Sequence, residues 1–390
     1  MLSVKNPIMT GFFPDPSICR VGNKFYTVHS TFAYFPGVPV FESEDLVHWN
    51  LISNVLDRDS QVPLSGCQHS EGIFAPTIRY HKGTWYMITT NVSDQGNFIV
   101  TAKDPRGPWS EPYYLGESTG GIDPSLFFDD DGTCYYIGQR PRSAGYRYNG
   151  DCEIWIQTLD LDTMQLKPDA TIVLTGFQRK AIWPEGPHLY KKDGYYYILH
   201  AESGTSIHHS VMIARSKNVF GPYEYCPCNP ILTHRHLGAQ YPVTCVGHAD
   251  LVDDGNGNWY MVVLACRPNQ GYTLLGRETF LAKVTWEDGW PVVNAGVGHL
   301  EEVVTLPYEG QPSDDVPQCK TYTFDTPSLP LELLTLRNHR DHELELHAEE
   351  HMVRLFHRCD SLKDCGELAY LALRKENWNC ELETSFMRHF

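Results

Sequence analysis

Five copies of one short unit recur along this chain and limit the folds that it can adopt. Each copy has a small apolar run, a turn rich in Gly, Asp, Asn or Lys, and then an aromatic strand. The copies begin with FPDPS, IFAPT, GIDPS, PEGPH and GHADL, and their aromatic strands centre on Tyr26, Tyr86, Tyr136, Tyr197 and Tyr260. A repeat of roughly 50 residues with several strands per copy is typical of a β-propeller. Alternating blocks that end in turns follow each aromatic strand, so we predict an all-β chain with a five-bladed β-propeller.

The texture of the sequence changes near Tyr308, which divides the chain into two predicted domains. Residues 1–307 carry the five repeats, and the Pro-, Asp- and Ser-rich residues 308–320 indicate a linker. Residues 321–390 alternate apolar and polar residues well enough for about five short strands. We expect them to form the beginning of a C-terminal β-sandwich that is incomplete, because its sheet edges and apolar faces lack a covering layer. Such a tail should pack onto the propeller, pair with another chain or be poorly ordered.

Charge and hydropathy exclude several classes of partner. The chain has 31 Lys and Arg against 48 Asp and Glu, a net charge of −17, which argues against nucleic acid. Its longest apolar run, MVVLAC, is too short to cross a membrane, and its start does not resemble a secretory signal, so we expect a cytoplasmic protein. The 12 cysteines are irregularly spaced and are interpreted as free thiols. Oligomeric state stays open, with a homo-oligomer allowed.

One register of the repeat carries the residues that could perform chemistry. At this register stand Asp15, Phe74, Asp123, Glu185 and His248. Equivalent positions of propeller blades face a common axis, so we expect three carboxylates and an imidazole to converge on one pocket. Taken singly, the carboxylates could be ordinary turn residues, and His248 could be a core histidine satisfied by the backbone. The near-repetition of FPDPS in GIDPS favours the functional interpretation.

The surroundings of two carboxylates predict different ionisation. Asp15 lies between two prolines, which hold the backbone still. Glu185 lies among prolines and next to Trp183, where little water should raise its pKa and keep it protonated. A base and an acid facing one pocket suggest glycoside hydrolysis, with Asp123 tuning the acid. A divalent-cation site is the competing use of three acids. Arg277 could pair with a carboxylate or bind sugar hydroxyls.

These residues and their neighbouring motifs resemble glycoside hydrolase family 43, the five-bladed propeller enzymes that include β-xylosidases and α-L-arabinofuranosidases. The resemblance runs in order through NPIMTGFFPDPSICRVG, STFAYFPGVPVFESEDLVHW, GIFAPTIRYH, GIDPSLFFDDDG, WPEGPHLYKKDGYYYILHAESGT, GHADLV and LGRETFLAKVTWEDGWPV. It implies that Asp15 is the general base, Asp123 the orienting and pKa-tuning carboxylate and Glu185 the general acid of an inverting exo-glycosidase. It also places Phe32 and Phe74 on the pocket wall and Arg277 against the substrate. His248 would lie at the axis, where some members hold a calcium ion through waters.

The chain departs from the family pattern at two places. Many xylosidases of the family have Trp where this chain has Phe74, which leaves the choice between xylose and arabinofuranose open. Relatives with a C-terminal β-sandwich have one much longer than residues 321–390. The substrate implied is a small oligosaccharide, with no cofactor required. Two rival functions remain: a retaining, invertase-like fructosidase, although FPDPS is not its NDPNG-type motif, and a non-catalytic sugar-binding propeller.

Overall fold

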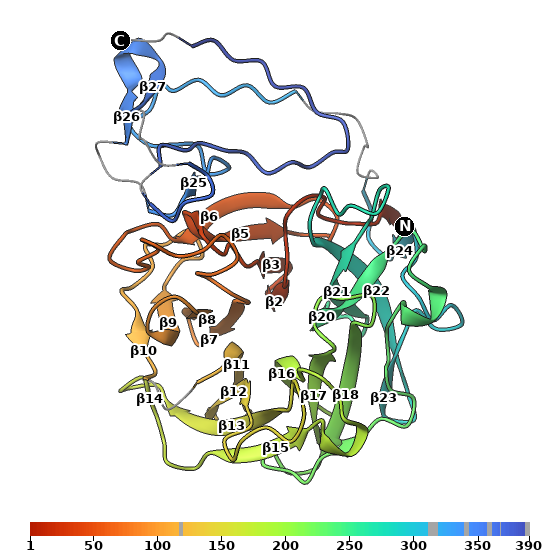
Figure 1. Ribbon diagram of the computed structural model, residues 1–390. Coiled ribbons are helices and arrows are strands. Elements are labelled where there is room, and N and C mark those ends of the chain that lie inside the picture. The colour runs from red at the N-terminus through yellow and green to blue at the C-terminus, as the bar shows by residue number, and fades with distance from the viewer. Residues whose placement is uncertain (117–119, 311–318, 339–342, 357–360, 367, 387–390) are drawn as a thin grey trace.

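Five β-sheets surround a central axis in the computed structural model, which describes residues 1–116, 120–310, 319–338, 343–356, 361–366 and 368–386 (Figure 1). The innermost strand of each sheet faces the axis: β2 (Ser17–Val21), β7 (Thr77–His81), β11 (Ile122–Phe128), β16 (Glu185–Lys192) and β20 (Thr244–Asp253). The next strands outward are β3 (Lys24–Val28), β8 (Thr84–Asn91), β12 (Cys134–Pro141), β17 (Tyr195–Glu202) and β21 (Trp259–Cys266). These sheets confirm the prediction of a five-bladed β-propeller.

Each blade continues outward by antiparallel pairing. The third strands are β5 (Gly37–Ser43), β9 (Gly96–Ala102), β13 (Cys152–Asp160), β18 (Ser210–Ser216) and β22 (Glu278–Glu287). The outer strands are β6 (Asn50–Leu56), β10 (Tyr113–Tyr114), β14 (Gln165–Leu166) with β15 (Thr171–Thr175), β19 (Glu224–Tyr225) and β23 (Trp290–Val293). Three short 3-10 helices, Phe177–Arg179, Arg235–Leu237 and Ala348–Glu350, lie in connections. No helix in the described part of the chain has the length and apolar composition to cross a lipid bilayer.

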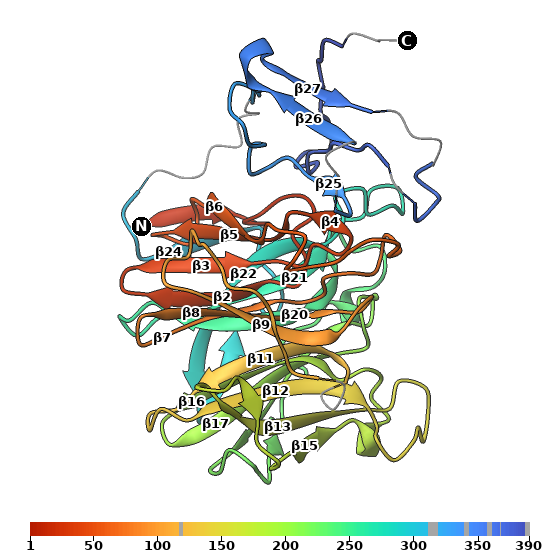
Figure 2. The same ribbon diagram turned by 90° about the vertical axis from the view of Figure 1, so that its left-hand side faces the viewer.

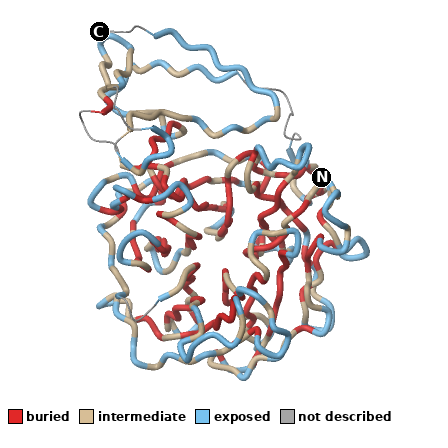
Figure 3. The backbone as a smooth tube through the Cα atoms, in the orientation of Figure 1, coloured by how far each residue is buried: buried red, intermediate tan, exposed pale blue. Residues whose placement is uncertain are grey.

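The five tyrosines of the sequence repeat occupy the second strand of each blade and are all buried. They belong to four hydrophobic clusters that each fill the space between two neighbouring blades, and a fifth cluster fills the space between the third and fourth blades. Figure 3 shows the buried positions concentrated along the inner strands and the exposed ones along the outer loops. Because each cluster joins two blades, burial of apolar surface is the main force that holds the ring together.

The two ends of the propeller sequence meet in one small sheet. The strand β1 (Leu2–Lys5) pairs with β24 (Val303–Leu306) in antiparallel register. Leu2 and Val304 from this pair are buried in the cluster between the first and fifth blades. Asn6 adds a side-chain hydrogen bond of 2.8 Å to the carbonyl of Leu281 on β22. The first and last segments of the repeat region therefore close the ring together.

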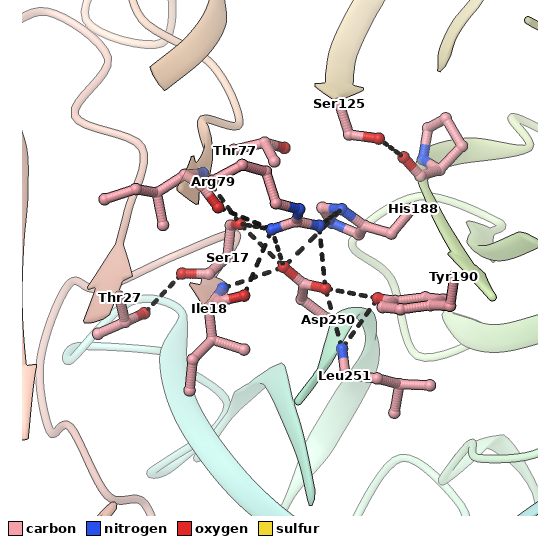
Figure 4. A network of polar contacts seen from close by, with 12 residues as sticks. Ser17, Ile18, Thr27, Thr77, Arg79, Ser125, His188, Tyr190, Asp250 and Leu251 are labelled. Atoms are coloured by element: carbon pink, nitrogen blue, oxygen red, sulfur yellow. Dashed lines mark hydrogen bonds and ion pairs between the residues drawn. The ribbon is translucent and has the colours of Figure 1, made fainter. Parts of the chain in front are cut away.

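A buried ion pair holds the inner strands together at the axis (Figure 4). The Arg79 guanidinium on β7 donates to the Asp250 carboxylate on β20 over 3.0 Å, and Asp250 is fully buried. Ser17 on β2 donates to the same carboxylate over 2.9 Å, as does the Tyr190 hydroxyl from β16. The Arg79 side chain also donates to His188 Nδ1 over 3.0 Å. Four of the five blades thus meet at one carboxylate, which was not foreseen from the sequence.

Removal of one partner of this ion pair should weaken the fold strongly. Arg79→Met leaves the Asp250 charge buried without its counter-ion, so we expect the free energy of unfolding to fall by about 3 kcal/mol or more. Urea denaturation at neutral pH measures the change. Arg58→Met is the matched control, because Arg58 pairs with Glu111 at the surface and should lose less than about 1 kcal/mol. Equal losses in the two variants would show that the axial pair carries no special weight.

The tail after residue 319 packs onto the first blade (Figure 2). The strand β25 (Thr335–Leu336) pairs with β4 (Tyr34–Phe35), and Leu336 is buried in the cluster between the first two blades. The buried Arg337 donates to the carbonyl of Cys67 over 2.8 Å. Further along, the guanidinium of Arg374 lies 5.2 Å from the centre of the Phe13 ring. Packing onto the propeller was one of the three arrangements expected for this segment.

The described residues of the tail contain less sheet than the alternation predicted. Besides β25, they form one hairpin, β26 (Leu344–His347) and β27 (Met352–Leu355). Residues 368–373 and 380–386 were expected to be strands, but in the described structure they make only an isolated bridge between Leu334 and Ala372. Alternation creates an apolar face without providing a neighbouring strand, and a strand needs such a neighbour for its hydrogen bonds. Of the predicted linker, residues 311–318 lie outside the described residues.

Candidate active site

A break in strand pairing recurs at the predicted register of the inner strands. On β11 the pairing moves from Ile122 to Ser125 while the partner strand advances by only two residues, which leaves an extra residue there. Similar irregularities occur on β16 after Glu185 and on β20 around His248. Asp15, Asp123 and His248 have positive φ angles of 54°, 54° and 51°. Bulges redirect side chains away from the alternation of a strand, so the backbone itself places these groups at the end of the blades.

Asp15 is held as an anion. Its carboxylate accepts hydrogen bonds from the Ser30 hydroxyl over 2.6 Å and from Arg277 Nη1 over 2.8 Å. Burial by itself raises the pKa of Asp15, but the charge of Arg277, together with His248 and Ser30, leaves the pKa below its usual value. Asp15 is therefore ionised at neutral pH and available to accept a proton.

Asp123 and Glu185 have raised pKa values, in contrast to Asp15. Burial raises the pKa of Glu185 to about 8, and the negative charge of Asp15 adds to the rise. Burial also raises the pKa of Asp123 well above its usual value, with repulsion from Glu185 and Asp15 as further causes. The backbone N–H of Gly186 donates to Asp123, which moderates the effect. The structure thus brings the three predicted carboxylates together and keeps a proton available on the Asp123–Glu185 pair at neutral pH.

The pH dependence of activity should change when Asp123 loses its charge. Asp123→Asn removes one of the two buried carboxyl groups that repel each other when both are ionised, so the last proton of the pair should leave Glu185 at lower pH and the alkaline limb of the kcat/KM profile should move to lower pH. Asn also tolerates the positive φ angle of this position. The measurement is a pH–rate profile on an aryl glycoside, with Asp131→Asn, in the exposed turn after β11, as control. An alkaline limb that stays in place would contradict tuning by Asp123.

Aromatic rings lie beside the arginine that holds the base. The rings of Phe32 and Phe74 lie 5.3 Å apart between centres, and the Phe12 ring lies 5.8 Å from that of Phe32. The Arg277 guanidinium lies 4.9 Å from the centre of the Phe32 ring while its other contact is Asp15. Both predicted wall residues therefore lie next to the base and its arginine. A hydrophobic wall beside charged groups is typical of a sugar-binding pocket.

His248 lies beside the acid and is neutral at ordinary pH. A side chain at Gly186, directly after Glu185, would approach the His248 ring to 2.9 Å, so the ring packs closely on that backbone. Burial lowers the pKa of His248; the negative charge of Asp15 opposes this effect and the charge of Arg277 adds to it, and the pKa stays below its usual value. The described residues contain no group of three or more His, Cys, Asp or Glu side chains arranged for a metal ion. Calcium prefers six to eight oxygen ligands, which a nitrogen ligand near an arginine does not offer. A calcium ion held through waters stays a prediction, and no chemical step below depends on it.

Two neighbours of the site were missed from the sequence. Ser30 donates to Asp15 and stands two residues after the end of β3, the aromatic strand of the first repeat. The corresponding ends of β12 and β17 lie opposite the Asp123 and Glu185 regions of β11 and β16. The position just after the aromatic strand of each repeat could therefore have been used to predict Ser30 as a neighbour of the site. His209 is buried, donates from Nδ1 to the carbonyl of Cys245 over 3.0 Å and packs against Gly247. No repeat marks His209, because it lies in the loop between β17 and β18 of the fourth blade.

The chain matches known proteins over most of its length. The model of a family described as "Glycosyl hydrolases family 43" matches residues 4–291. A xylosidase/arabinosidase of Butyrivibrio fibrisolvens is 57% identical over 378 residues, which cover 96% of this chain and 73% of that protein. A non-reducing end alpha-L-arabinofuranosidase of Bacteroides ovatus is 44% identical over 346 residues, covering 86% of this chain and 61% of that protein.

A solved structure gives the same result for the fold. The xylan beta-1,4-xylosidase of Bacillus halodurans superposes with a TM-score of 0.86 at 38% sequence identity, covering 96% of this chain and 72% of that one. The shared fold, the matched residues 4–291 and the close approach of three buried carboxyl groups agree with one another. The chain belongs to glycosyl hydrolase family 43.

Proposed function

We propose that this protein is an inverting exo-glycosidase that releases xylose or arabinofuranose from small oligosaccharides. In this proposal Asp15 is the general base, Glu185 the general acid and Asp123 the carboxylate that tunes the acid. One observation carries it: two buried carboxyl groups that lie close enough to interact have pKa values shifted in opposite directions. A base and an acid that are both ready at neutral pH are what glycoside hydrolysis requires.

The reaction follows from these protonation states. Asp15 takes a proton from a water molecule as the water attacks the anomeric carbon, and Glu185 gives its proton to the departing glycosidic oxygen. Arg277 and Ser30 hold the Asp15 carboxylate in one orientation. After the reaction Asp15 carries a proton and Glu185 is an anion, so a proton returns through solvent before the next cycle. Inversion asks for carboxyl groups roughly 6.5–9.5 Å apart, with a water between.

The names of the relatives support both sugars. The B. fibrisolvens relative is named for xylosidase and arabinosidase activity, whereas the B. ovatus relative is named an arabinofuranosidase and the B. halodurans structure a xylosidase. Comparison of turnover on an aryl β-xylopyranoside and an aryl α-arabinofuranoside decides which sugar is preferred. Turnover of neither would favour a non-catalytic sugar-binding propeller.

The stereochemistry of the product tests the assignment of Asp15. With a water between base and sugar, we expect the first-formed sugar to have the anomeric configuration opposite to that of the substrate. Proton NMR during the first minutes of hydrolysis resolves the two anomers before they equilibrate. Retention would remove Asp15 from the role of general base and favour the invertase-like alternative, in which a carboxylate attacks the sugar directly.

A further inference from the structure

Two cysteines of the fifth blade lie next to each other on neighbouring strands. Cys245 belongs to β20 and Cys266 ends β21, and the strand register pairs Cys266 with Thr244, the residue directly before Cys245. The two thiols are close enough to hydrogen-bond to each other. Both are free, and no step of the proposed hydrolysis uses either one.

A β-bulge brings the two thiols onto the same side of the sheet. Between Thr244 and Gly247 the strand β20 advances by three residues while β21 advances by two, and Cys245 has a positive φ angle of 58°. In a regular ladder Cys245 would point to the face opposite that of Thr244 and of its partner Cys266. The extra residue removes this alternation. A positive φ angle at a residue other than glycine is uncommon, so the contact between the thiols depends on an unusual backbone conformation.

The two thiols differ in exposure and in ionisation. Cys266 is 4% exposed, whereas Cys245 is half-buried. The hydrogen bond with Cys266 lowers the pKa of Cys245 to about 6, with a contribution from the Thr244 hydroxyl and against the effect of burial. The same bond, followed by burial, raises the pKa of Cys266. Cys245 is therefore the nucleophilic thiolate at neutral pH, and Cys266 is placed as the resolving thiol.

The pair lies behind the groups that surround the base. The carbonyl of Cys245 accepts the hydrogen bond of 3.0 Å from His209 Nδ1. Cys266 lies near enough to Arg277 for the guanidinium charge to act on the pKa of its thiol. Arg277 in turn holds Asp15 over 2.8 Å. A change in the position of either cysteine therefore reaches the neighbours of the catalytic base.

The chain after Cys266 provides a second connection. The next residue, Arg267, donates to the buried Glu278 through two nitrogens over 2.7 and 2.8 Å. Glu278 directly follows Arg277 and accepts the backbone N–H of Gly11 over 3.1 Å. A covalent bond holds two sulfur atoms closer together than hydrogen-bonded thiols stand, so its formation must shift β20 against β21. Displacements of about 1 Å at catalytic groups can lower activity by about 10²-fold.

We propose that Cys245 and Cys266 are a site of reversible oxidation, at which a peroxide converts the two thiols to a disulfide and thereby lowers activity. The Cys245 thiolate attacks one oxygen of hydrogen peroxide, the O–O bond breaks, and a sulfenic acid and one water are formed. The Cys266 sulfur then attacks the sulfenic sulfur, and the oxygen leaves with the Cys266 proton as a second water. The thiols lose two electrons, which the peroxide oxygens gain, and a dithiol reductant reverses the change by exchange. Oxidation of the pair is independent of the proposed glycosidase function, whereas its effect on activity rests on that function.

The test treats the full chain with hydrogen peroxide and follows two quantities. Peptide mass spectrometry should find the Cys245 and Cys266 peptides joined, with the loss of two hydrogen atoms. The value of kcat/KM on an aryl glycoside should fall by about tenfold or more. Dithiothreitol should restore both quantities.

Three variants identify the thiols responsible. Cys245→Ser should keep its activity in peroxide, and Cys266→Ala should stop at a sulfenic acid on Cys245, which dimedone labels. Cys228→Ser is the matched control, because it removes an exposed thiol after β19 of the fourth blade and should respond to peroxide as the parent does.

The proposal is overturned if both thiols stay reduced in peroxide, if the disulfide forms without a change in kcat/KM, or if Cys245→Ser loses as much activity as the parent. Inactivity of the untreated parent on both aryl glycosides is a different result. It counts against the glycosidase function and the effect on activity, while mass spectrometry still decides whether the pair is oxidised.

Discussion

Glu185→Gln should lower kcat/KM on oligosaccharides by about 10²–10⁴-fold, the range that loss of a general acid produces. Sugar leaving groups are poor and need a proton, whereas activated aryl leaving groups depart as stable anions. We therefore expect the same variant to lose less than about tenfold on an activated aryl glycoside. The difference between the two substrates, rather than the size of either loss, identifies an acid.

Two controls accompany the Glu185 variant. Glu224→Gln changes a surface carboxylate on β19 of the same blade and should leave both activities intact. Unfolding should not be weakened in Glu185→Gln, because a buried carboxyl whose pKa is raised to about 8 costs stability at any pH above its unfolded value, and glutamine removes that cost. Equal loss of activity on both substrates would mean that Glu185 acts in another way, such as positioning the sugar.

Asp15→Asn should lower kcat/KM by a similar factor, about 10²–10⁴, but on oligosaccharides and activated aryl glycosides alike. Attack by water needs the base whatever the leaving group is, so a better leaving group cannot compensate. Asn is the right replacement because it accepts the φ angle of 54° and can still bond to Ser30 and Arg277. Steady-state kinetics on the two substrate types measures the outcome.

The interpretation of Asp15→Asn needs a check on folding, since Arg277 loses its counter-ion. Thermal unfolding and Asp57→Asn, a surface substitution beside Arg58, supply the comparison. A folded Asp15→Asn protein that keeps its activity on aryl glycosides would contradict the role of general base. Loss on both substrates together with retention at the anomeric centre in the parent enzyme would instead indicate a nucleophile.

The blades were predictable because their signal is local. The five tyrosines and the turns before them mark strands by residue type, and each tyrosine is indeed buried between blades. The register of Asp15, Asp123 and Glu185 could be read in the same way, since identical positions of repeated units face one axis. The tail shows the limit of local signals: residues 368–373 alternate as a strand should, yet they make no ladder in the described structure.

Contacts between residues far apart in the sequence depend on closure of the ring and could not be predicted from the repeat. The Arg79–Asp250 pair joins residues 171 positions apart, and the bond from Arg277 to Asp15 joins residues 262 positions apart. Neither pair shares a local pattern, because such a contact exists only after the blades have closed around the axis.

The sequence by itself indicated the number of blades and the register that brings Asp15, Asp123 and Glu185 together, since both depend on residue identity and spacing. The sequence around Glu185 already predicted a raised pKa for that acid, but only the tertiary structure decided that Asp15 stays ionised. Asp15 and Glu185 are both buried, and burial raises the pKa of both, but only Asp15 receives the guanidinium of Arg277. At Asp15 the charge of Arg277, 2.8 Å away, acts together with His248 and the Ser30 hydroxyl to outweigh desolvation, and this arrangement forms where the fifth blade meets the first.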